Sequence, residues 1–257
     1  MNRPKKKIPL IHLLRQNWPE IPQEKLLALI LCGEVEVEGG RIKDPKCLVN
    51  PDAVPRHLPP RFVSRGGWKL EGFLNSLSWS VEGKVILDAG SSTGGFTDCL
   101  LQRGAVLVHS VDVGRNQLHW KLRKDPRVKV QEGTGIMDVL DLDPPVCGAV
   151  ADLSFRSLRG AAGHILHLTT EGWLIALIKP QFEWKNPTED FKGIVPTGEL
   201  KGILKEVLQD LEKEGIWAQK LAPSELPGSD GNQEFLALLT KTPGPDFESL
   251  FPSNFSF

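Results

Sequence analysis

Lys179 closes the apolar run "LIALIK" and is followed at once by Pro180. Lysine is rarely buried without a partner, so a lysine at the end of a buried strand is a candidate for chemistry. A lysine held partly out of water releases its proton more readily and can act as a base near neutral pH. The competing interpretation is a lysine whose ammonium group reaches back to solvent from the strand end.

Other charged side chains stand beside predicted strand ends. Asp152 follows "CGAVA", Glu234 precedes "FLALLT", and Lys69 lies in "SRGGWKL". Ligands of an open α/β sheet bind beyond the carboxyl ends of its strands, and an antiparallel last strand would begin at that same edge. We therefore expect Asp152 and Glu234 to orient Lys179, with Lys69 completing the cluster from a helix. For Lys69 alone, an exposed helical lysine is the simpler interpretation.

A glycine-rich turn, "LDAGSSTGGFTDCL", joins a predicted strand to a predicted helix. Turns of this kind hold nucleotide-like ligands on backbone N–H groups. Phe96 stands where a Walker A loop has its lysine, and Ser92 stands where a dinucleotide loop has a glycine. Neither phosphate loop therefore matches. Gly94 and Gly95 still allow close approach of the backbone to a ligand.

Asp112 ends the next predicted strand, where a carboxylate can accept hydrogen bonds from ribose hydroxyls. A site for ribose without pyrophosphate indicates S-adenosylmethionine as the cofactor. The alternative is an ordinary strand–turn–helix connection capped by Ser91, Ser92 or Thr93. With Asp112, the predicted cofactor contacts of the turn are Asp88, Gly90, Ser91, Thr93, Gly94, Gly95 and Phe96.

Strand and helix patterns alternate after the prolines at 51, 55, 59 and 60. The expected strands cover 83–90, 105–114, 127–133, 145–155 and 172–183, and the expected helices cover 66–77, 94–104, 116–125, 156–169 and 199–215. Segments 216–226 and 232–241 read as a closing hairpin. This order predicts an α/β domain with a doubly wound, mostly parallel sheet and an antiparallel last strand.

The proline-rich stretch separates a small first unit from this domain. In the first unit, 23–31 reads as a helix, 34–37 reads as a strand, and Gly39-Gly40 is a hairpin signal. We predict a small domain with its linker over 1–58, the α/β domain over 59–242 and a loose tail over 243–257.

The composition narrows the possible partners. The 257 residues carry a net charge of −1, so any nucleic-acid contact must come from local basic patches. No apolar run reaches the ~18 residues of a membrane span, and no signal peptide is recognisable. Four cysteines without a paired motif fit a reducing cytoplasm. We expect a cytoplasmic protein with no membrane partner and no metal site. The composition leaves the oligomeric state open, with a monomer favoured.

Six segments together resemble the TlyA family of FtsJ-like RNA ribose 2′-O-methyltransferases, whose older label is haemolysin. In order they are "SRGGWKL", "LDAGSSTGGFTDCLLQRGA", "VDVGRNQLHWKLRKDPRV", "ADLSF", "LIKPQFE" and "GNQEFLALL". The resemblance implies a Rossmann-like S-adenosylmethionine-dependent methyltransferase domain behind a small α+β, S-four-like RNA-binding domain. It also implies ribosomal RNA or ribosomal subunits as the partner, with a cytidine ribose as the target.

The resemblance places a catalytic tetrad on Lys69, Asp152, Lys179 and Glu234. It implies that Lys179 takes or steers the proton of the 2′-hydroxyl, and that Lys69 and Glu234 orient Lys179 and the ribose. It also implies that Asp152 holds Lys179 and lies beside the cofactor. The family's cofactor contacts fall on Gly94, Phe96, Asp112, Thr134 and Asp152, with Asp138 as an alternative to Thr134.

The first unit departs from the family pattern, because Lys25 is the only cation of its helix "PQEKLLALI". Phosphate contacts supply much of the affinity for RNA, so other cations must compensate. The candidates are Lys5, Lys6, Lys7, Arg41, Lys43 and Lys46. Two other functions stay open: a non-catalytic protein that binds RNA or ribosomes, and a haemolysin, although no amphipathic basic helix supports lysis.

Overall fold

The computed structural model describes residues 6–154, 156–187, 191–228 and 230–251. Its contacts divide the chain into two compact units, Met1–Arg65 and Gly66–Phe257. The predicted boundary at residue 58 precedes this division and stays a prediction. Lys5, the phenylalanine of "ADLSF" and the last six residues of the predicted tail lie outside the described residues.

The first unit has a small core of α and β elements. Fully buried leucines of two helices form its centre, among them Leu13, Leu14 and Leu26. The predicted helix at 23–31 and the hairpin at Gly39-Gly40 are confirmed. No element is predicted over 8–17, where a strand and a helix are found. The elements are β1 (Ile8–Pro9), α1 (Leu10–Asn17), α2 (Gln23–Leu31), β2 (Val35–Val37), β3 (Gly40–Arg41), β4 (Leu48–Val49) and β5 (Arg56–His57).

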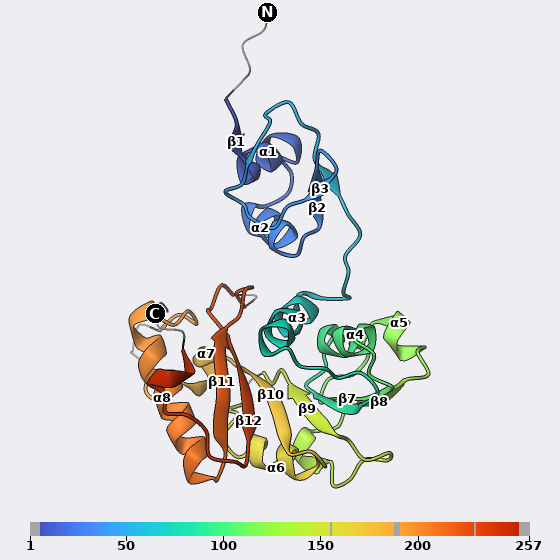
Figure 1. Cartoon of the computed structure of the whole chain (residues 1–257), viewed down its shortest axis with the longest axis vertical. Helices are drawn as coiled ribbons and strands as arrows, with labels where there is room; N and C mark the ends of the chain where they lie inside the picture. Colours follow the sequence, from blue (N-terminus) through green and yellow to red (C-terminus); the bar gives the residue numbers. More distant parts are fainter. Residues whose placement is uncertain (1–5, 155, 188–190, 229, 252–257) are drawn as a thin grey trace, which may run out of the picture. The chain divides into compact units, whose positions relative to one another are not determined.

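A seven-stranded sheet is the framework of the second unit, in the order β11-β12-β10-β9-β6-β7-β8 (Figure 1). Strand β12 runs antiparallel to β10 and β11, and the pairs among β6 to β10 are parallel. The predicted mostly parallel sheet with an antiparallel last strand is therefore confirmed. The strands are β6 (Val85–Ala89), β7 (Leu107–Asp112), β8 (Val128–Glu132), β9 (Gly148–Ala151), β10 (Trp173–Ile178), β11 (Trp217–Pro223) and β12 (Phe235–Thr240).

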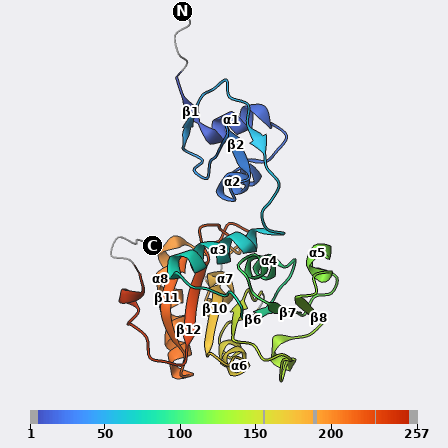
Figure 2. The same ribbon diagram turned by 45° about the vertical axis from the view of Figure 1, so that its right-hand side comes forward.

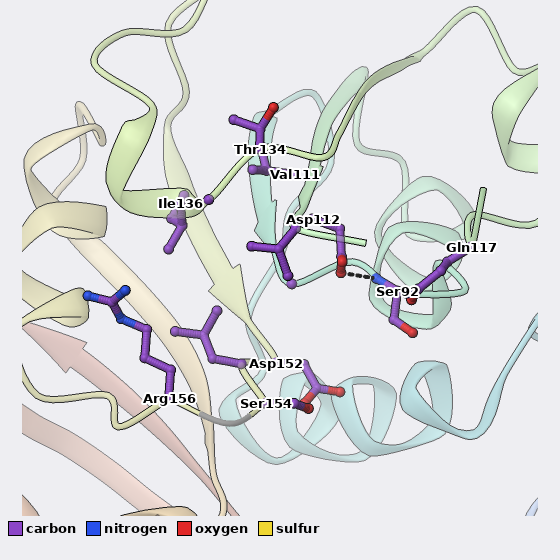
Figure 3. A pocket seen from close by; sticks show the side chains of 13 residues that line it. Ser92, Val111, Asp112, Gln117, Thr134, Ile136, Asp152, Ser154 and Arg156 are labelled. Atoms are coloured by element: carbon purple, nitrogen blue, oxygen red, sulfur yellow. Dashed lines mark hydrogen bonds between the residues drawn. The ribbon is translucent and has the colours of Figure 1, made fainter. Parts of the chain in front are cut away.

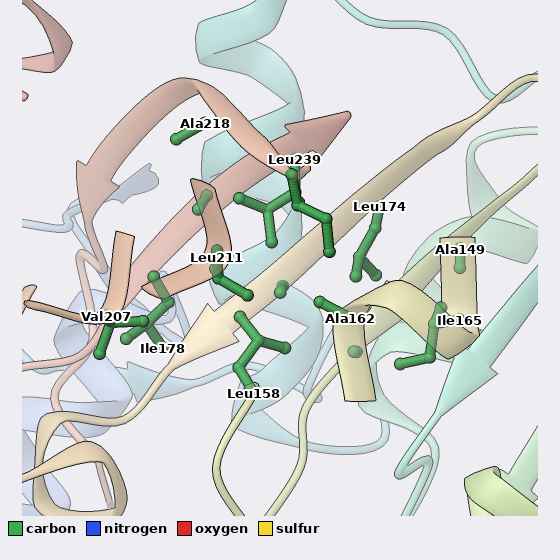
Figure 4. Packing of buried hydrophobic residues seen from close by; sticks show 14 of the residues in the cluster. Ala149, Leu158, Ala162, Ile165, Leu174, Ile178, Val207, Leu211, Ala218 and Leu239 are labelled. Carbon is green, nitrogen blue, oxygen red and sulfur yellow. The ribbon is translucent and has the colours of Figure 1, made fainter. Parts of the chain in front are cut away.

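Helices cover both faces of this sheet, as the alternation of side chains along β6 shows. Leu87 and Ala89 belong to the main core cluster, whereas Asp88 faces α4 and bonds to Thr97. Figure 4 shows Ile165 of α6 and Leu211 of α8 in the same cluster. Figure 2 shows α8 alongside β11. The helices are α3 (Arg65–Leu77), α4 (Gly95–Gln102), α5 (Trp120–Arg123), α6 (Ala161–His167), α7 (Pro180–Glu183) and α8 (Thr197–Lys213), with short 3₁₀ turns η1 (Ile136–Asp138) and η2 (Glu248–Leu250).

The strand predicted over 145–155 is found only as β9, Gly148–Ala151. Three other predicted elements also extend too far, each for a local reason. Strand β10 ends at Ile178, and the continuation predicted as strand is helix α7, because Pro180 at its first position favours a helical start. Helix α5 begins later than predicted, because Asn116 has a φ of 59°, which a right-handed helix excludes, and the N–H groups of residues 116–118 bond to Glu132 in the loop before it. Helix α6 begins only after Gly160, whose φ of 72° interrupts it.

The predicted loose tail is packed in its described part. Leu250 is buried, and Phe247 and Phe251 pack against the main core of the unit. Their rings meet edge to face, with centroids 5.3 Å apart. The tail therefore covers apolar surface up to residue 251.

Candidate functional site

A pocket of about 540 Å³ opens at the carboxyl ends of β6, β7 and β9 (Figure 3). This is the edge at which an open α/β sheet binds its ligands, and the volume suits a small ligand or cofactor. Val111, Ile136 and Leu153 give the pocket apolar walls. The remaining described lining consists of Gly90, Ser92, Asp112, Val113, Gln117, Thr134, Gly135, Asp152, Ser154 and Arg156.

Asp112 is fixed at the end of β7 by its neighbours. Its carboxylate accepts hydrogen bonds from the N–H groups of Ser92 at 2.7 Å and of Gly114 at 2.6 Å. Figure 3 shows the first of these bonds as a dashed line. A carboxylate has about four acceptor positions, so Asp112 keeps the capacity to accept further bonds from a diol.

The backbone at Gly90 approaches the end of β9 closely. Gly90 has a φ of 81°, and a Cβ atom there would lie 2.6 Å from the carbonyl oxygen of Asp152. The Asp152 N–H donates to Ala89 O at 3.0 Å. Only glycine permits both the backbone angle and this contact, so the floor of the pocket depends on the residue type at position 90.

The predicted cofactor residues divide into two groups in the structure. Gly90, Asp112, Thr134 and Asp152 line the pocket, and the alternative to Thr134, Asp138, is not among the lining residues. The other six are likewise absent from the described lining, and their contact with a cofactor stays a prediction. These six are Asp88, Ser91, Thr93, Gly94, Gly95 and Phe96.

Asp88 lies beneath the turn and is fully buried. Thr97 Oγ1 donates to its Oδ2 at 2.6 Å, whereas Oδ1 has no hydrogen-bond partner among the described residues. Burial, with added repulsion from Asp152 and Asp112, raises the pKa of this carboxyl from 3.8 to about 7, although the Thr97 bond opposes the rise.

The raised pKa of Asp88 predicts a pH-dependent stability. The folded state binds this proton more tightly than the unfolded state, so the stabilisation is complete below pH 4 and is lost as the pH rises towards 7. This loss lowers the free energy of unfolding by at most roughly 4 kcal/mol, and Asp88→Asn is expected to abolish it. Urea unfolding of both proteins at pH 5 and pH 8 measures it, and identical pH dependence of the two would contradict the assignment.

The strand register brings the predicted tetrad to the same edge. Ile178 of β10 pairs with Phe235 of β12, so the residues at the next position of this strand pair are Lys179 and Glu234. Residues opposite each other in an antiparallel pair have neighbouring side chains on one face. Asp152 follows Ala151, which pairs with β6 and β10. Residues 152, 179 and 234 therefore converge from three strands.

Ion pairs complete the cluster. Lys179 Nζ lies 2.6 Å from Asp152 Oδ1 and donates to Ser154 Oγ at 2.8 Å. Lys69 Nζ on α3 donates to the carboxylate of Glu234, and both side chains are buried. A buried charge is costly without a partner, which explains why each lysine has a carboxylate. Of the four, only Asp152 is among the described residues that line the pocket.

Three contacts that position the site escape prediction from the sequence. Ser154 binds Lys179, and Glu132 accepts from the N–H groups of residues 116–118 at 2.8 to 3.0 Å. Glu183, buried in α7, accepts from Leu158 N at 2.6 Å and pairs with Arg159 at 2.9 Å. Each of the three has a partner 14 to 25 residues away, which spacing in the sequence does not reveal, and only Ser154 stands near a predicted strand end.

The donor set of the pocket fits a nucleoside-like cofactor. The pocket combines apolar walls with Asp112, Asp152 and exposed backbone, which suits an adenosine and a charged amino-acid end. Among the described residues, no group of three or more His, Cys, Asp or Glu side chains is arranged to hold a metal ion. Within the same part of the chain, no helix is both long and apolar enough to cross a membrane.

Comparison with known proteins decides the family. A model described as FtsJ-like methyltransferase matches residues 62–241. The chain belongs to this family. The FtsJ-like methyltransferase match covers the whole sheet and all four residues of the tetrad.

Relatives of this FtsJ-like methyltransferase confirm the predicted TlyA resemblance. TlyA of Mycobacterium tuberculosis (strain CDC 1551 / Oshkosh), named a 16S/23S rRNA (cytidine-2′-O)-methyltransferase, is 36% identical over 231 residues, which is 86% of this chain and 85% of TlyA. YqxC of Bacillus subtilis (strain 168), named as a candidate rRNA methyltransferase, is 40% identical over 223 residues, covering 83% and 79%. A solved structure from Streptococcus thermophilus, described as a candidate hemolysin, has a TM-score of 0.66 at 34% identity, covering 93% and 90%.

Proposed function

We propose that this protein is an S-adenosylmethionine-dependent methyltransferase that modifies the 2′-hydroxyl of a cytidine ribose in ribosomal RNA. The observation that carries the proposal is the convergence of Lys69, Asp152, Lys179 and Glu234 at the sheet edge that also holds the pocket. The names of the TlyA relatives support ribosomal RNA and cytidine. We propose that it acts in the cytoplasm as a monomer.

Residues of the pocket are suited to hold the cofactor. When bound, S-adenosylmethionine supplies a methyl group activated by its sulfonium. Asp112 would accept hydrogen bonds from the ribose hydroxyls of the cofactor, and the apolar walls formed by Val111 and Ile136 would hold its adenine. Asp152 carries its negative charge at the same pocket, where it favours a cationic ligand.

Lys179 is the proposed base. Its Nζ, when neutral, accepts the proton that leaves the 2′-hydroxyl oxygen as this oxygen gains the methyl group. The positive charge that forms on Nζ is stabilised by Asp152 at 2.6 Å, and Ser154 holds the amine in place at 2.8 Å. Glu234, at the position opposite Lys179, and Lys69, which is paired with Glu234 from α3, orient Lys179 and the ribose. Positioning matters because a ribose hydroxyl is a poor nucleophile.

The first unit is the proposed S-four-like RNA-binding domain. Its helix α2 carries one cation, Lys25. Five other cations of the described first unit are exposed and can contact phosphates: Lys6, Lys7, Arg41, Lys43 and Lys46.

Methyl transfer tests the proposed function. Purified protein is incubated with unmodified ribosomal RNA and S-adenosylmethionine carrying a labelled methyl group, and the RNA is digested to nucleosides. The label is expected in 2′-O-methylcytidine. Label on a base, or no label together with normal RNA binding, would contradict the proposal and favour a non-catalytic RNA-binding protein.

Asp112→Asn is expected to weaken S-adenosylmethionine binding by roughly 10- to 100-fold. The amide keeps the size of the side chain but loses the charge and one acceptor, and hydrogen bonds to a charged group contribute about 1.5–3 kcal/mol. Calorimetric titration measures the dissociation constant. Asp141→Asn, at an exposed position outside the pocket lining, is the matched control. Unchanged affinity in Asp112→Asn would show that this carboxylate does not hold the cofactor.

A further inference from the structure

A strongly basic segment spans residues 113–129. It carries six Lys and Arg residues and one Asp, in a chain whose net charge is −1. It begins at Val113, which lines the pocket, passes through helix α5 and ends in β8. Such a local concentration of positive charge attracts an anionic partner even when the whole chain is nearly neutral.

Trp120 presents a large aromatic surface on this segment. Its side chain is 66% exposed, although indole rings are usually well buried. Lys124 Nζ lies 5.4 Å from the ring centroid, and the His119 ring lies beside it at 5.9 Å. An exposed ring flanked by cations is the combination with which proteins bind single-stranded nucleic acid, because bases stack on the ring and phosphates meet the cations.

The cations next to Trp120 are not neutralised by carboxylates. Asp125 pairs with Arg127 and Glu132 pairs with Arg123, each at 2.7 Å. Within the described ranges, Arg115 and Lys124 have no carboxylate partner. In the same ranges, the ion pair of Lys121 is the long one with Asp98, at 4.0 Å. We call Arg115, Trp120, Lys121 and Lys124 the α5 surface.

The α5 surface is held firmly against the pocket. Leu118 and Leu122 are buried and lie over the cofactor turn, where a Cβ atom on Gly94 would come within 2.2 Å of Leu122. Glu132 fixes the loop before α5 through three backbone N–H groups and Arg123. These bonds lower the pKa of Glu132 from 4.5 to about 2, and the bond from Arg123 contributes most. Gln117, in the same loop, lines the pocket.

We propose that the α5 surface binds a single-stranded segment of the substrate RNA beside the target nucleotide, with one base stacked on Trp120 and phosphates on Arg115, Lys121 and Lys124. This inference rests on the proposed function, since it names the form in which the RNA meets the methyltransferase unit. The pocket-lining residues Val113 and Gln117 connect the surface to the cofactor site.

Removal of the ring tests the stacking contact. Trp120→Ala is expected to raise both the dissociation constant of a fluorescein-labelled 12-residue oligocytidylate and the KM for ribosomal RNA by about fivefold or more. kcat and S-adenosylmethionine affinity are expected to stay at wild-type values. Trp120→Phe, which keeps an aromatic face, is expected to recover most of the loss.

The charge contribution has its own readout. Lys124→Gln is expected to reduce the slope of log affinity against log salt by about 0.7, the value for one phosphate of a single strand. Val106→Ala and Lys201→Gln are the controls, because Val106 is 51% exposed at the opposite end of β7 and Lys201 lies in α8. Both controls are expected to behave as the wild type.

The outcomes separate the inference from the proposed function. If Trp120→Ala binds RNA and methylates it as the wild type does, the α5 surface does not bind RNA as proposed, and the proposed methyltransferase function is unaffected. The opposite result is that the wild type transfers no methyl group to RNA but binds the oligonucleotide in a way that depends on Trp120. This result would contradict the proposed function and support RNA binding by the α5 surface. Equal losses in Trp120→Ala and Val106→Ala would also count against the surface.

Discussion

Lys179→Met is expected to lower kcat for methyl transfer to ribosomal RNA by about 10²- to 10⁴-fold, the usual contribution of a positioned base. Methionine keeps much of the length of the side chain but has no amine to accept the proton. Asp152 stays in the pocket wall, so S-adenosylmethionine affinity is expected to change little. Single-turnover kinetics with labelled cofactor and calorimetry of cofactor binding give the two quantities.

Lys179→Arg distinguishes a base from a cation that only holds Asp152. Arginine keeps the positive charge and the ion pair but does not release its proton near neutral pH. We expect Lys179→Arg to be as inactive as Lys179→Met, and Lys201→Met, at an exposed site on α8, to be fully active. Substantial activity in Lys179→Arg would show that this position acts through its charge alone.

Gly90→Ala is expected to lower activity by roughly 100-fold and the free energy of unfolding by about 2–4 kcal/mol. The new Cβ would lie 2.6 Å from the carbonyl oxygen of Asp152, which is backbone and has to move. The φ of 81° adds strain of about 1–3 kcal/mol for a residue other than glycine. Displacement of Asp152 disturbs both the pocket and the Lys179 pair, and a shift of 1 Å can cost 100-fold in rate.

Gly83→Ala is the matched control for this substitution. Gly83 precedes the same strand and has a φ of 72°, but a Cβ there meets nothing within 4 Å. Strain alone therefore lowers the stability of Gly83→Ala, as chemical denaturation measures, and leaves its specific activity unchanged. Equal activity of the two variants would show that the approach of Gly90 to Asp152 is not needed for the reaction.

The architecture of the second unit was predictable because its signals are local. Strands β6, β9 and β10 are short, mainly apolar runs, and polar residues such as Asp88, Asp152 and Lys179 mark their ends. Parallel topology then places these ends on one edge, and the closing hairpin adds Glu234. Asp152, Lys179 and Glu234 lie at one sheet edge for this reason, and Lys69 reaches Glu234 from helix α3. The roles of all four in the reaction stay a prediction.

Contacts between distant segments account for what the sequence did not predict. The pattern of residues 116–125 favours a full helix, but Asn116 has a φ of 59°, and Glu132 holds residues 116–118 as a loop through their N–H groups. Pro180 ends the strand after Ile178, although the apolar pattern continues to Phe182. The split of the cluster into a Lys179–Asp152 pair and a Lys69–Glu234 pair depends on side-chain geometry that spacing does not encode.

Mapping of ribose methylation in cells tests the central claim most directly. Ribosomal RNA is compared from a strain that lacks this protein and from the same strain supplied with the wild type or with Lys179→Met. The account predicts that one or a few 2′-O-methylcytidines are absent from the deletion strain, return with the wild type and do not return with Lys179→Met. Identical methylation in all the strains would contradict it.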